Sequence, residues 1–82
     1  MPRYFFDARE DDALTPDHEG IELPDLTAAE HEALEAAASI ARDELLAGQA
    51  RSITIEVWTE DRRRVLAATV SMYVDRGDPH LH

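Results

Sequence analysis

The chain has 82 residues, of which 44% are hydrophobic and 32% are charged, and its formal net charge is -10 because 18 acidic residues outnumber 8 basic ones. This length predicts one domain with a small core, and the composition is that of a globular protein. The acidic surplus argues against sequence-independent binding of nucleic acid, which needs a basic surface. It favours basic partners or metal cations, although such a surplus also serves solubility alone.

Cysteine is absent, which excludes disulfide bonds, thiolate metal sites and thiol catalysis. No apolar run approaches the roughly 20 residues of a membrane-spanning helix. The first three residues lead directly into strand-like sequence, without the basic and apolar regions of a secretory signal. We therefore expect a cytoplasmic protein.

The first strand is predicted at the N-terminus, where residues 3–9 alternate with a period of two. The side chains expected to face the core are Tyr4, Phe6 and Ala8. The opposite face carries Arg3, Phe5, Asp7 and Arg9. This segment is predicted to lie inside the sheet.

A connection and a short strand follow. Residues 10–12 are all acidic and break the alternation, and residues 15–17, Thr-Pro-Asp, have the composition of a turn, so we expect a hairpin loop or a longer connection. Residues 20–23 alternate briefly and stop at Pro24. This pattern predicts a short strand at an edge of the sheet.

A helix is predicted to begin near Leu26, with Asp25 as its N-cap or with Thr27 and Glu30 as an alternative capping box. It is expected to end at Gly48, which suits a left-handed cap. The apolar residues form one stripe at helical spacing, flanked by Leu34 and Leu45: Leu26, Ala29, Ala33, Ala37, Ile40 and Ala41. Because alanine buries little area, the sheet has to supply most of the core.

Two longer strands are predicted after the helix. Residues 52–59 alternate and are rich in β-branched side chains, with Ile53, Ile55 and Val57 on the buried face. After a polar turn, residues 64–74 alternate again. Their inward set is Leu66, Ala68, Val70, Met72 and Val74, and their outward set is Val65, Ala67, Thr69, Ser71 and Tyr73. Residues 75–82 show no periodicity, so we expect a domain over residues 1–74 and a flexible tail over residues 75–82.

The order strand, strand, helix, strand, strand predicts an α+β fold of two layers, ββαββ, with a four-stranded sheet and one helix across one face. With the strands numbered along the chain, we expect the β-grasp-like sheet order 2-1-4-3, in which strands one and four are parallel. The reason is that the aromatic first strand and the long fourth strand suit central positions. The fully antiparallel order 2-1-3-4 is the alternative.

The second face of this sheet is expected to be open, since one helix of about 22 residues covers only one side. Exposed apolar patches with polar rims mark interfaces, and tryptophan, tyrosine and arginine often anchor them. We therefore expect Phe5, Trp58 and Tyr73 to anchor an interface on this face, with Arg3 and Val65 beside them. In the alternative, Trp58 packs within the monomer at the sheet edge or under the C-terminal tail.

No metal site is predicted. Five acidic residues near the first connection suggest calcium: Asp7, Asp11, Asp12, Asp17 and Glu19. Their spacing does not match the twelve-residue calcium loop, so we expect a solvated acidic loop. His18 and His31 have no second histidine at a ligand spacing and are expected on the surface. His80 and His82, with Asp78 nearby, have the geometry of a weak, adventitious zinc or nickel chelate.

No catalytic site is predicted either. Ser39, Ser52 and Ser71 lie in no motif that activates a serine, and no nucleophile, base and orienting group form a catalytic set. The expected fold offers little concavity for a substrate pocket. We therefore expect no catalytic residues, no cofactor and no enzymatic activity.

Two segments carry a resemblance to a known family. Residues 1–7, Met-Pro-Arg-Tyr-Phe-Phe-Asp, and residues 19–26, Glu-Gly-Ile-Glu-Leu-Pro-Asp-Leu, precede an alanine-rich helix that contains Glu-Ala-Leu at residues 32–34. This pattern resembles a family of short, uncharacterised alphaproteobacterial proteins, common in rhizobia. The resemblance covers residues 2–73 and implies the fold outline, without an activity or a cofactor. Members often have glycine in the first turn, where this chain has two aspartates, so the tightness of that turn stays open.

A second resemblance is to antitoxins of the HicB type, which also run from an aromatic first strand through a glycine and Pro-Asp-Leu into a helix. Those proteins have three strands before the helix, whereas two are predicted here. Residues 1–48 hold 13 acidic and 3 basic side chains, and the resemblance implies that this acidic front half of the chain neutralises a basic toxin.

These observations predict a small cytoplasmic domain that acts through protein contacts, as a homodimer formed across the open sheet face or with a protein partner. Neither nucleic acid nor a membrane is expected as a partner. The alternative is an acidic inhibitor or antitoxin-like module that binds a basic protein through its carboxylates. The two differ in salt response, because charge-driven capture weakens with ionic strength and an aromatic interface does not.

Overall fold

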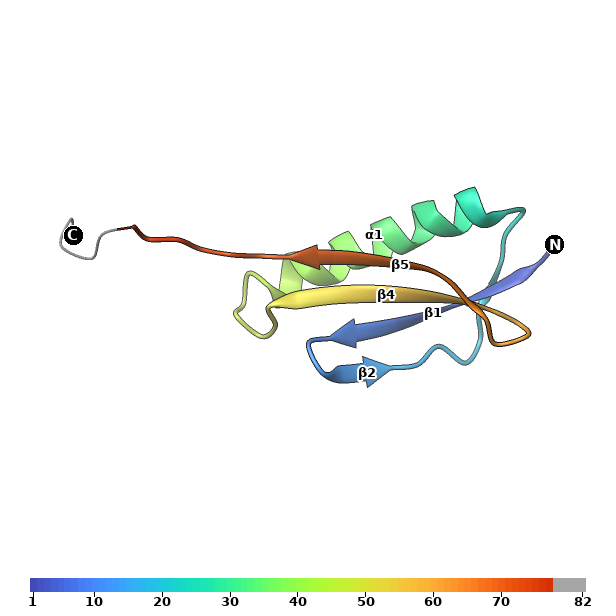
Figure 1. The fold of residues 1–82 in the computed structure, drawn as a ribbon, viewed down its shortest axis with the longest axis horizontal. Coiled ribbons are helices and arrows are strands. Elements are labelled where there is room, and N and C mark those ends of the chain that lie inside the picture. The colour runs from blue at the N-terminus through green and yellow to red at the C-terminus, as the bar shows by residue number, and fades with distance from the viewer. Residues whose placement is uncertain (78–82) are drawn as a thin grey trace.

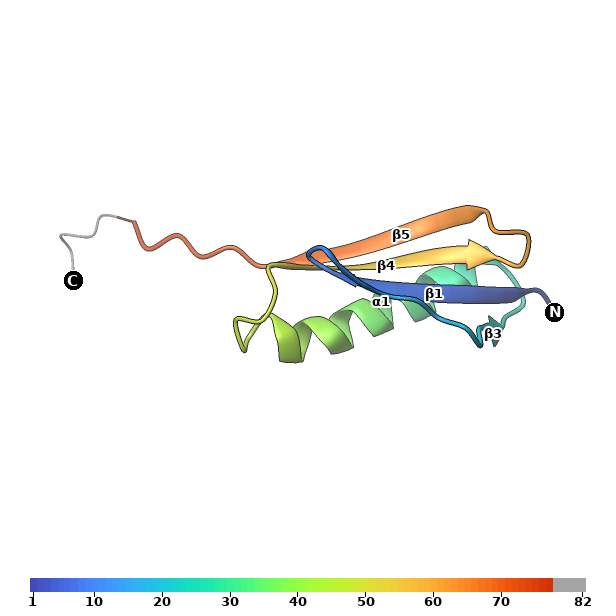
Figure 2. The same ribbon diagram turned by 90° about the horizontal axis from the view of Figure 1, so that it is seen from below.

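The structure is a computed structural model and describes residues 1–77. In order along the chain, it contains β1 (Arg3–Glu10), β2 (Ala13–Thr15), β3 (Ile21–Glu22), α1 (Leu26–Glu44), β4 (Ser52–Thr59) and β5 (Arg64–Ser71). The helix lies across one face of an antiparallel sheet, and within the described residues no element covers the other face (Figures 1 and 2). The predicted α+β class is confirmed, with five strands in place of the expected four. No helix in residues 1–77 has the length and apolarity needed to cross a membrane.

The sheet order is β2-β1-β4-β5, and β3 pairs with β1 beside β2. The preferred order with parallel first and last strands is wrong, because β1 pairs antiparallel with β4 from Tyr4–Thr59 to Glu10–Ile53. The observed arrangement corresponds to the alternative order 2-1-3-4. The physical basis of this order is the apolar stripe of β4, which consists of Ile53, Ile55 and Val57. These side chains are almost fully buried, so β4 needs a strand on each side.

The sequence patterns did not predict β2. This strand forms a tight hairpin with β1 through Asp11 and Asp12, and Asp11 has a φ of 52°. The carboxylate of Asp11 accepts hydrogen bonds from the backbone N–H groups of Arg51 and Ser52, at 3.0 and 3.1 Å from Oδ1. These bonds stabilise the turn without glycine, and they tie it to the start of β4.

The helix begins as predicted. The Oδ1 atom of Asp25 accepts a hydrogen bond from the N–H of Ala28 at 2.9 Å, which makes Asp25 the N-cap. The helix ends at Glu44 and not at Gly48, but one further turn follows. That turn closes with Gly48 at a φ of 74° and with a 2.8 Å hydrogen bond from the N–H of Gln49 to the carbonyl of Glu44. This pattern is a Schellman motif, so Gly48 acts as the expected left-handed cap of that final turn.

The core lies between the helix and the sheet. Its larger cluster joins three fully buried alanines of α1 to the buried side chains of β1 and β4: Ala29, Ala33, Ala37, Tyr4, Ile55 and Val57. A smaller cluster at the end of the helix joins Ala41, Leu45 and Ile53. Leu26 and Leu34, which were predicted on or beside the buried stripe, are exposed. The buried alanines bring the helix close to the sheet, and the strands supply the bulk.

The last strand is shorter than predicted. β5 ends at Ser71, whereas alternation predicted a strand up to Val74. The N–H of Met72 donates a hydrogen bond to the carbonyl of Arg51 at 3.2 Å, and Arg51 directly precedes β4. Residues 73–77 therefore run on without a strand beside them (Figure 1). Residues 78–82, with most of the predicted tail and the predicted His80–His82 chelate, lie outside the described residues.

Candidate interaction surface

The face of the sheet opposite the helix is the candidate surface, and we call it the open face. The strand register places three cross-strand rows on it. The first row pairs Phe5 with Trp58, the second pairs Asp7 with Glu56 and Ala67, and the third pairs Arg9 with Thr54 and Thr69. These residues alternate with buried ones on β1 and β4, as the sequence predicts. The open face therefore has an aromatic end and a polar middle.

Phe5 and Trp58 form the aromatic end. Both are half-buried, because other parts of the chain pack around them. A Cβ atom added at Gly20 would lie 3.0 Å from Cε2 of Phe5, so the backbone of Gly20 closely approaches this ring. The guanidinium of Arg62 lies 5.7 Å from the centre of the Trp58 ring, at a distance suited to a cation–π contact. The two aromatic side chains thus pack partly within the domain.

The indole nitrogen of Trp58 is an unusual feature of this end. Within the described residues, Nε1 is buried and has no hydrogen-bond partner. A buried donor without a partner costs on the order of 1–3 kcal/mol. The indole N–H of Trp58 is therefore an unfavourable group within the contact that Trp58 makes with Phe5 and Arg62.

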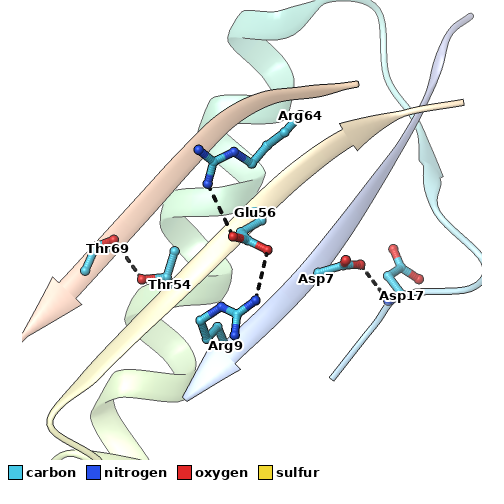
Figure 3. A network of polar contacts seen from close by, with 7 residues as sticks. All are labelled: Asp7, Arg9, Asp17, Thr54, Glu56, Arg64 and Thr69. Carbon is cyan, nitrogen blue, oxygen red and sulfur yellow. Dashed lines mark hydrogen bonds and ion pairs between the residues drawn. The ribbon is translucent and has the colours of Figure 1, made fainter. Parts of the chain in front are cut away.

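Glu56 organises the polar middle of the open face (Figure 3). Its carboxylate lies between two arginines, with Oε1 at 3.8 Å from Nη2 of Arg9 and Oε2 at 3.3 Å from Nη1 of Arg64. Beside this group, the hydroxyls of Thr54 and Thr69 share a 2.8 Å hydrogen bond. The charges in the middle of the face are therefore compensated by one another.

The position of Arg64 could not be read from alternation, which places it on the same face as Leu66. The register shifts by one residue between Val57 and Trp58, so that Val57 is opposite Leu66 but Trp58 is opposite Arg64. This irregularity puts the side chain of Arg64 on the open face, where it reaches Glu56 (Figure 3). It leaves the face of Leu66, Ala68 and Val70 against the helix unchanged.

Exposed apolar side chains gather along β5 and just beyond its end, and we call this stretch the β5 border. Val65 and Tyr73 alternate with the open-face residues Ala67 and Thr69, whereas Met72 and Val74 alternate with the helix-facing Leu66, Ala68 and Val70. Val65 is 39% exposed, Met72 46%, Val74 74% and Tyr73 87%. Val65 belongs to β5, but Tyr73 lies two residues beyond its end. The structure therefore brings Phe5, Trp58 and Val65 onto one face as predicted, and places Tyr73 beyond the sheet, next to it along the chain.

Arg3, the fifth predicted interface residue, serves the sheet edge. Its guanidinium donates to the carbonyl of Glu19 at 2.9 Å and lies 3.4 Å from a carboxylate oxygen of Glu22. It thereby holds β3 and the preceding loop against β1. Arg3 is half-buried, so part of its charge is already used within the domain.

The acidic residues of the first connection bind backbone groups of the chain itself. Asp17 accepts from the N–H of Phe6 at 3.0 Å through Oδ2, and from the N–H groups of Glu19 and Gly20 at 3.0 and 3.1 Å through Oδ1. The N–H of Asp17 donates to Asp7 at 2.9 Å (Figure 3). Desolvation acts to raise the pKa of Asp17, but the three N–H donors together with His18 hold the pKa below its ordinary value.

This arrangement gives Asp7, Asp11 and Asp17 a structural role. In residues 1–77 no three histidine, aspartate or glutamate side chains converge as metal ligands. His18 and His31 are exposed, and His31 lies 3.1 Å from Glu35 on the next helical turn. The described part of the chain also contains no pocket.

One family model matches the chain, over residues 3–71, and its description is "Domain of unknown function (DUF6894)". The match spans β1 to β5 and so includes the whole open face. No curated protein and no solved structure matches the chain.

Proposed function

We propose that this chain, which belongs to the DUF6894 family of domains of unknown function, is a cytoplasmic, non-catalytic protein-interaction domain that self-associates through its open sheet face. The observation that carries the proposal is the set of exposed apolar side chains at the β5 border, from Val65 on the open face to Val74 beyond the end of the strand. Removing such side chains from water is favourable by roughly 25 cal/mol per Å² of apolar area. Association of two copies buries this border on both of them.

The charge pattern favours a second copy over an oppositely charged partner. In the middle of the open face, Glu56 is already paired with Arg9 and Arg64, so this surface presents little uncompensated charge. Closed homodimers are also the commonest assemblies of soluble proteins. A core to which α1 contributes mainly alanine leaves a small domain with modest stability, which association increases.

Within this proposal the predicted anchors have different roles. Val65 and Tyr73 make the contact, because they are the exposed members of the set. Phe5 and Trp58 are half-buried and support this contact by packing within the domain. Arg3 holds β3 and its preceding loop at the opposite edge of the sheet.

The experiment that tests self-association is light scattering during size-exclusion chromatography over a range of protein concentrations. The wild type is expected to be a dimer, and Val65→Asp is expected to be a folded monomer because the new carboxylate enters the contact. Ile21→Asp is the matched control, since Ile21 is 43% exposed but belongs to β3 at the opposite edge of the sheet, and this variant should stay dimeric. A wild type that is monomeric at every concentration would overturn the proposal.

A basic protein partner is the second candidate, and the acidic outer side of α1 favours it. Glu30, Glu35 and Asp43 are exposed there, and Arg42 is the basic residue of the last helical turn. Salt separates the two functions. Capture of a basic protein weakens as salt is added, whereas self-association strengthens because the like charges of two chains of net charge -10 are screened.

A further inference from the structure

The two edges of the sheet are protected very differently. The outer side of β1 is covered by β2 and β3, which have three and two residues, and Pro16 follows β2 directly. Proteins commonly protect sheet edges with short strands, proline and charge. β5 has eight residues at the other edge, and in the described structure no strand pairs with its outer side. Arg64 and the irregularity beside it protect only the start of β5, and residues 65–74 contain neither a charged residue nor a proline, so the rest of this edge lacks these protections.

The hydrogen-bond pattern shows which backbone groups of β5 are free to pair. Because the N–H of Met72 donates to Arg51, Met72 and every second residue before it point their backbone groups toward β4. The alternate residues point theirs away from the sheet: Ala67, Thr69 and Ser71. These outward groups form the template that a further antiparallel strand needs.

We propose that β5 of one copy pairs antiparallel with β5 of a second copy, with Thr69 on the twofold axis, so that the two sheets become one. The inference rests on the proposed self-association and places its contact at the β5 border, so that the middle of the open face stays uncovered. In this register Ala67 faces Ser71 of the second copy through outward-pointing backbone groups. Val65 faces Tyr73 of the second copy on the open face, and Leu66 faces Met72 on the helix face.

Side-chain direction and charge select this register. Residues directly opposite each other in a sheet share a face. The twofold axis must therefore pass through a residue that faces the same residue of the second copy, and the two nearest alternative registers place this axis at Ala68 or at Val70. An axis at Ala68 places Tyr73 opposite Arg63. An axis at Val70 places Tyr73 opposite Ala67 and brings the like charges of Arg76 and Arg64 together. The axis at Thr69 places the exposed Tyr73 opposite the exposed Val65 and brings Asp75 to Arg63, with opposite charges, and beyond Arg63 the chain leaves the strand at Arg62, whose φ is 65°.

The pairing also accounts for the chain beyond β5. In the described structure, residues 73–77 run straight on past the end of the sheet with no strand beside them (Figure 1). In the paired form, Tyr73 lies against Val65 of the second copy, at the aromatic end of its open face. The most exposed large side chain of the border thereby becomes a contact between the two copies.

Cysteine cross-linking tests the register, because the native chain has no cysteine. In an antiparallel pair that exchanges both hydrogen bonds, the Cα atoms lie about 5.5 Å apart, which is within the range for a disulfide. Thr69→Cys is therefore expected to form a disulfide-linked dimer on mild oxidation. Ala67→Cys and Ser71→Cys alone should not, because like positions are then about 13 Å apart along the strands. Mixing these two variants before oxidation should give a mixed disulfide dimer.

Thr54→Cys is the matched control, since Thr54 lies on the same cross-strand row of the open face but on the inner strand β4. It should not cross-link. Efficient cross-linking of Thr54→Cys would overturn the edge pairing in favour of stacked faces, and efficient cross-linking of Ala67→Cys with itself would overturn the register centred on Thr69. A dimer by light scattering without a Thr69→Cys cross-link would overturn the edge pairing and leave self-association standing, whereas a monomeric wild type would remove both.

Discussion

The carboxylate of Asp17 accepts a hydrogen bond from the backbone N–H of Phe6 at 3.0 Å and occupies the gap between β2 and β3 along the edge of β1. Phe6 lies between the residues of β1 that pair with these two short strands, so no neighbouring strand reaches its N–H. The side chain of Asp17 thus accepts the hydrogen bond that a paired strand would otherwise accept from Phe6. The first prediction follows from this contact.

Asp17→Ala is expected to lower the free energy of unfolding by about 1–3 kcal/mol, since it removes acceptors from three backbone N–H groups. Denaturant unfolding followed by circular dichroism measures the change. Asp12→Ala is the control, because Asp12 is an exposed residue of the same connection. Equal losses in the two variants would contradict the assigned role of Asp17.

The pH dependence of stability should also report Asp17. Its folded-state pKa is lowered, so its contribution is fully present above the unfolded-state value of about 3.9 and is lost as pH falls through the folded-state pKa. The stability difference between wild type and Asp17→Asn is therefore expected to be constant from neutral pH to about pH 4 and to shrink below it. Unfolding midpoints of both proteins across this range measure it. A difference that grew on acidification would mean that the pKa is raised.

Two glycines offer a matched pair. Gly20 and Gly48 have φ values of 73° and 74°, but a Cβ at Gly20 would lie 2.9 Å from the carbonyl oxygen of Tyr4, whereas at Gly48 it meets nothing within 4 Å. Gly48→Ala is expected to cost only the conformational penalty of about 1 kcal/mol. Gly20→Ala should cost clearly more, because backbone atoms cannot move aside. Thermal unfolding of both variants tests this, and similar shifts would contradict it.

Proline substitutions in β5 separate folding from pairing. Ala67 points its N–H away from the sheet, so Ala67→Pro is expected to fold as a monomer and to lose the dimer. Ala68 points its N–H toward Ile55 on β4, so Ala68→Pro is expected to unfold the domain. Circular dichroism and light scattering on both variants give the answer. A dimeric Ala67→Pro would exclude pairing through the β5 edge.

Trp58→Phe is expected to leave the free energy of unfolding within about 1 kcal/mol of wild type. The substitution removes the buried Nε1 that has no partner in the described structure, while a ring still packs against Phe5. Trp58→Ala is the comparison, and its loss of packing should cost about 3 kcal/mol or somewhat less for a half-buried ring. Chemical denaturation measures both. A large loss in the phenylalanine variant would show that the indole nitrogen has an essential partner.

Much of the fold could be predicted from periodicity. Alternation placed Tyr4, Phe6 and Ala8 on the buried face of β1, and Ile53, Ile55 and Val57 on that of β4, where the structure has them. The strand order could not be read in this way, because periodicity assigns faces and not neighbours. A signal was present in β5: its outward residues Ala67, Thr69 and Ser71 are small or polar, as at an edge.

The rest depended on contacts between distant segments. β2 has three exposed residues, too few for a period to be recognised. The hydrogen bonds from the N–H of Phe6 to Asp17 and from the N–H of Arg51 to Asp11 join residues 11 and 40 positions apart, and a local pattern cannot show them. The open face was predicted with the correct strands, but the packing of Gly20 against Phe5 and of Arg62 over Trp58 made its aromatic end less exposed than expected.

The fully buried alanines of α1 limit how this protein can vary. Ala29, Ala33 and Ala37 have no exposed surface, and the closeness of the helix to the strands beneath is set by single methyl groups. A serine there would bury a hydroxyl whose available partner is a backbone carbonyl of the preceding helical turn, and a valine would push the two layers apart. The exposed positions of α1 can therefore vary freely, whereas its buried positions are confined to the smallest apolar side chain. We expect sequence variation in this helix to be concentrated on its exposed side.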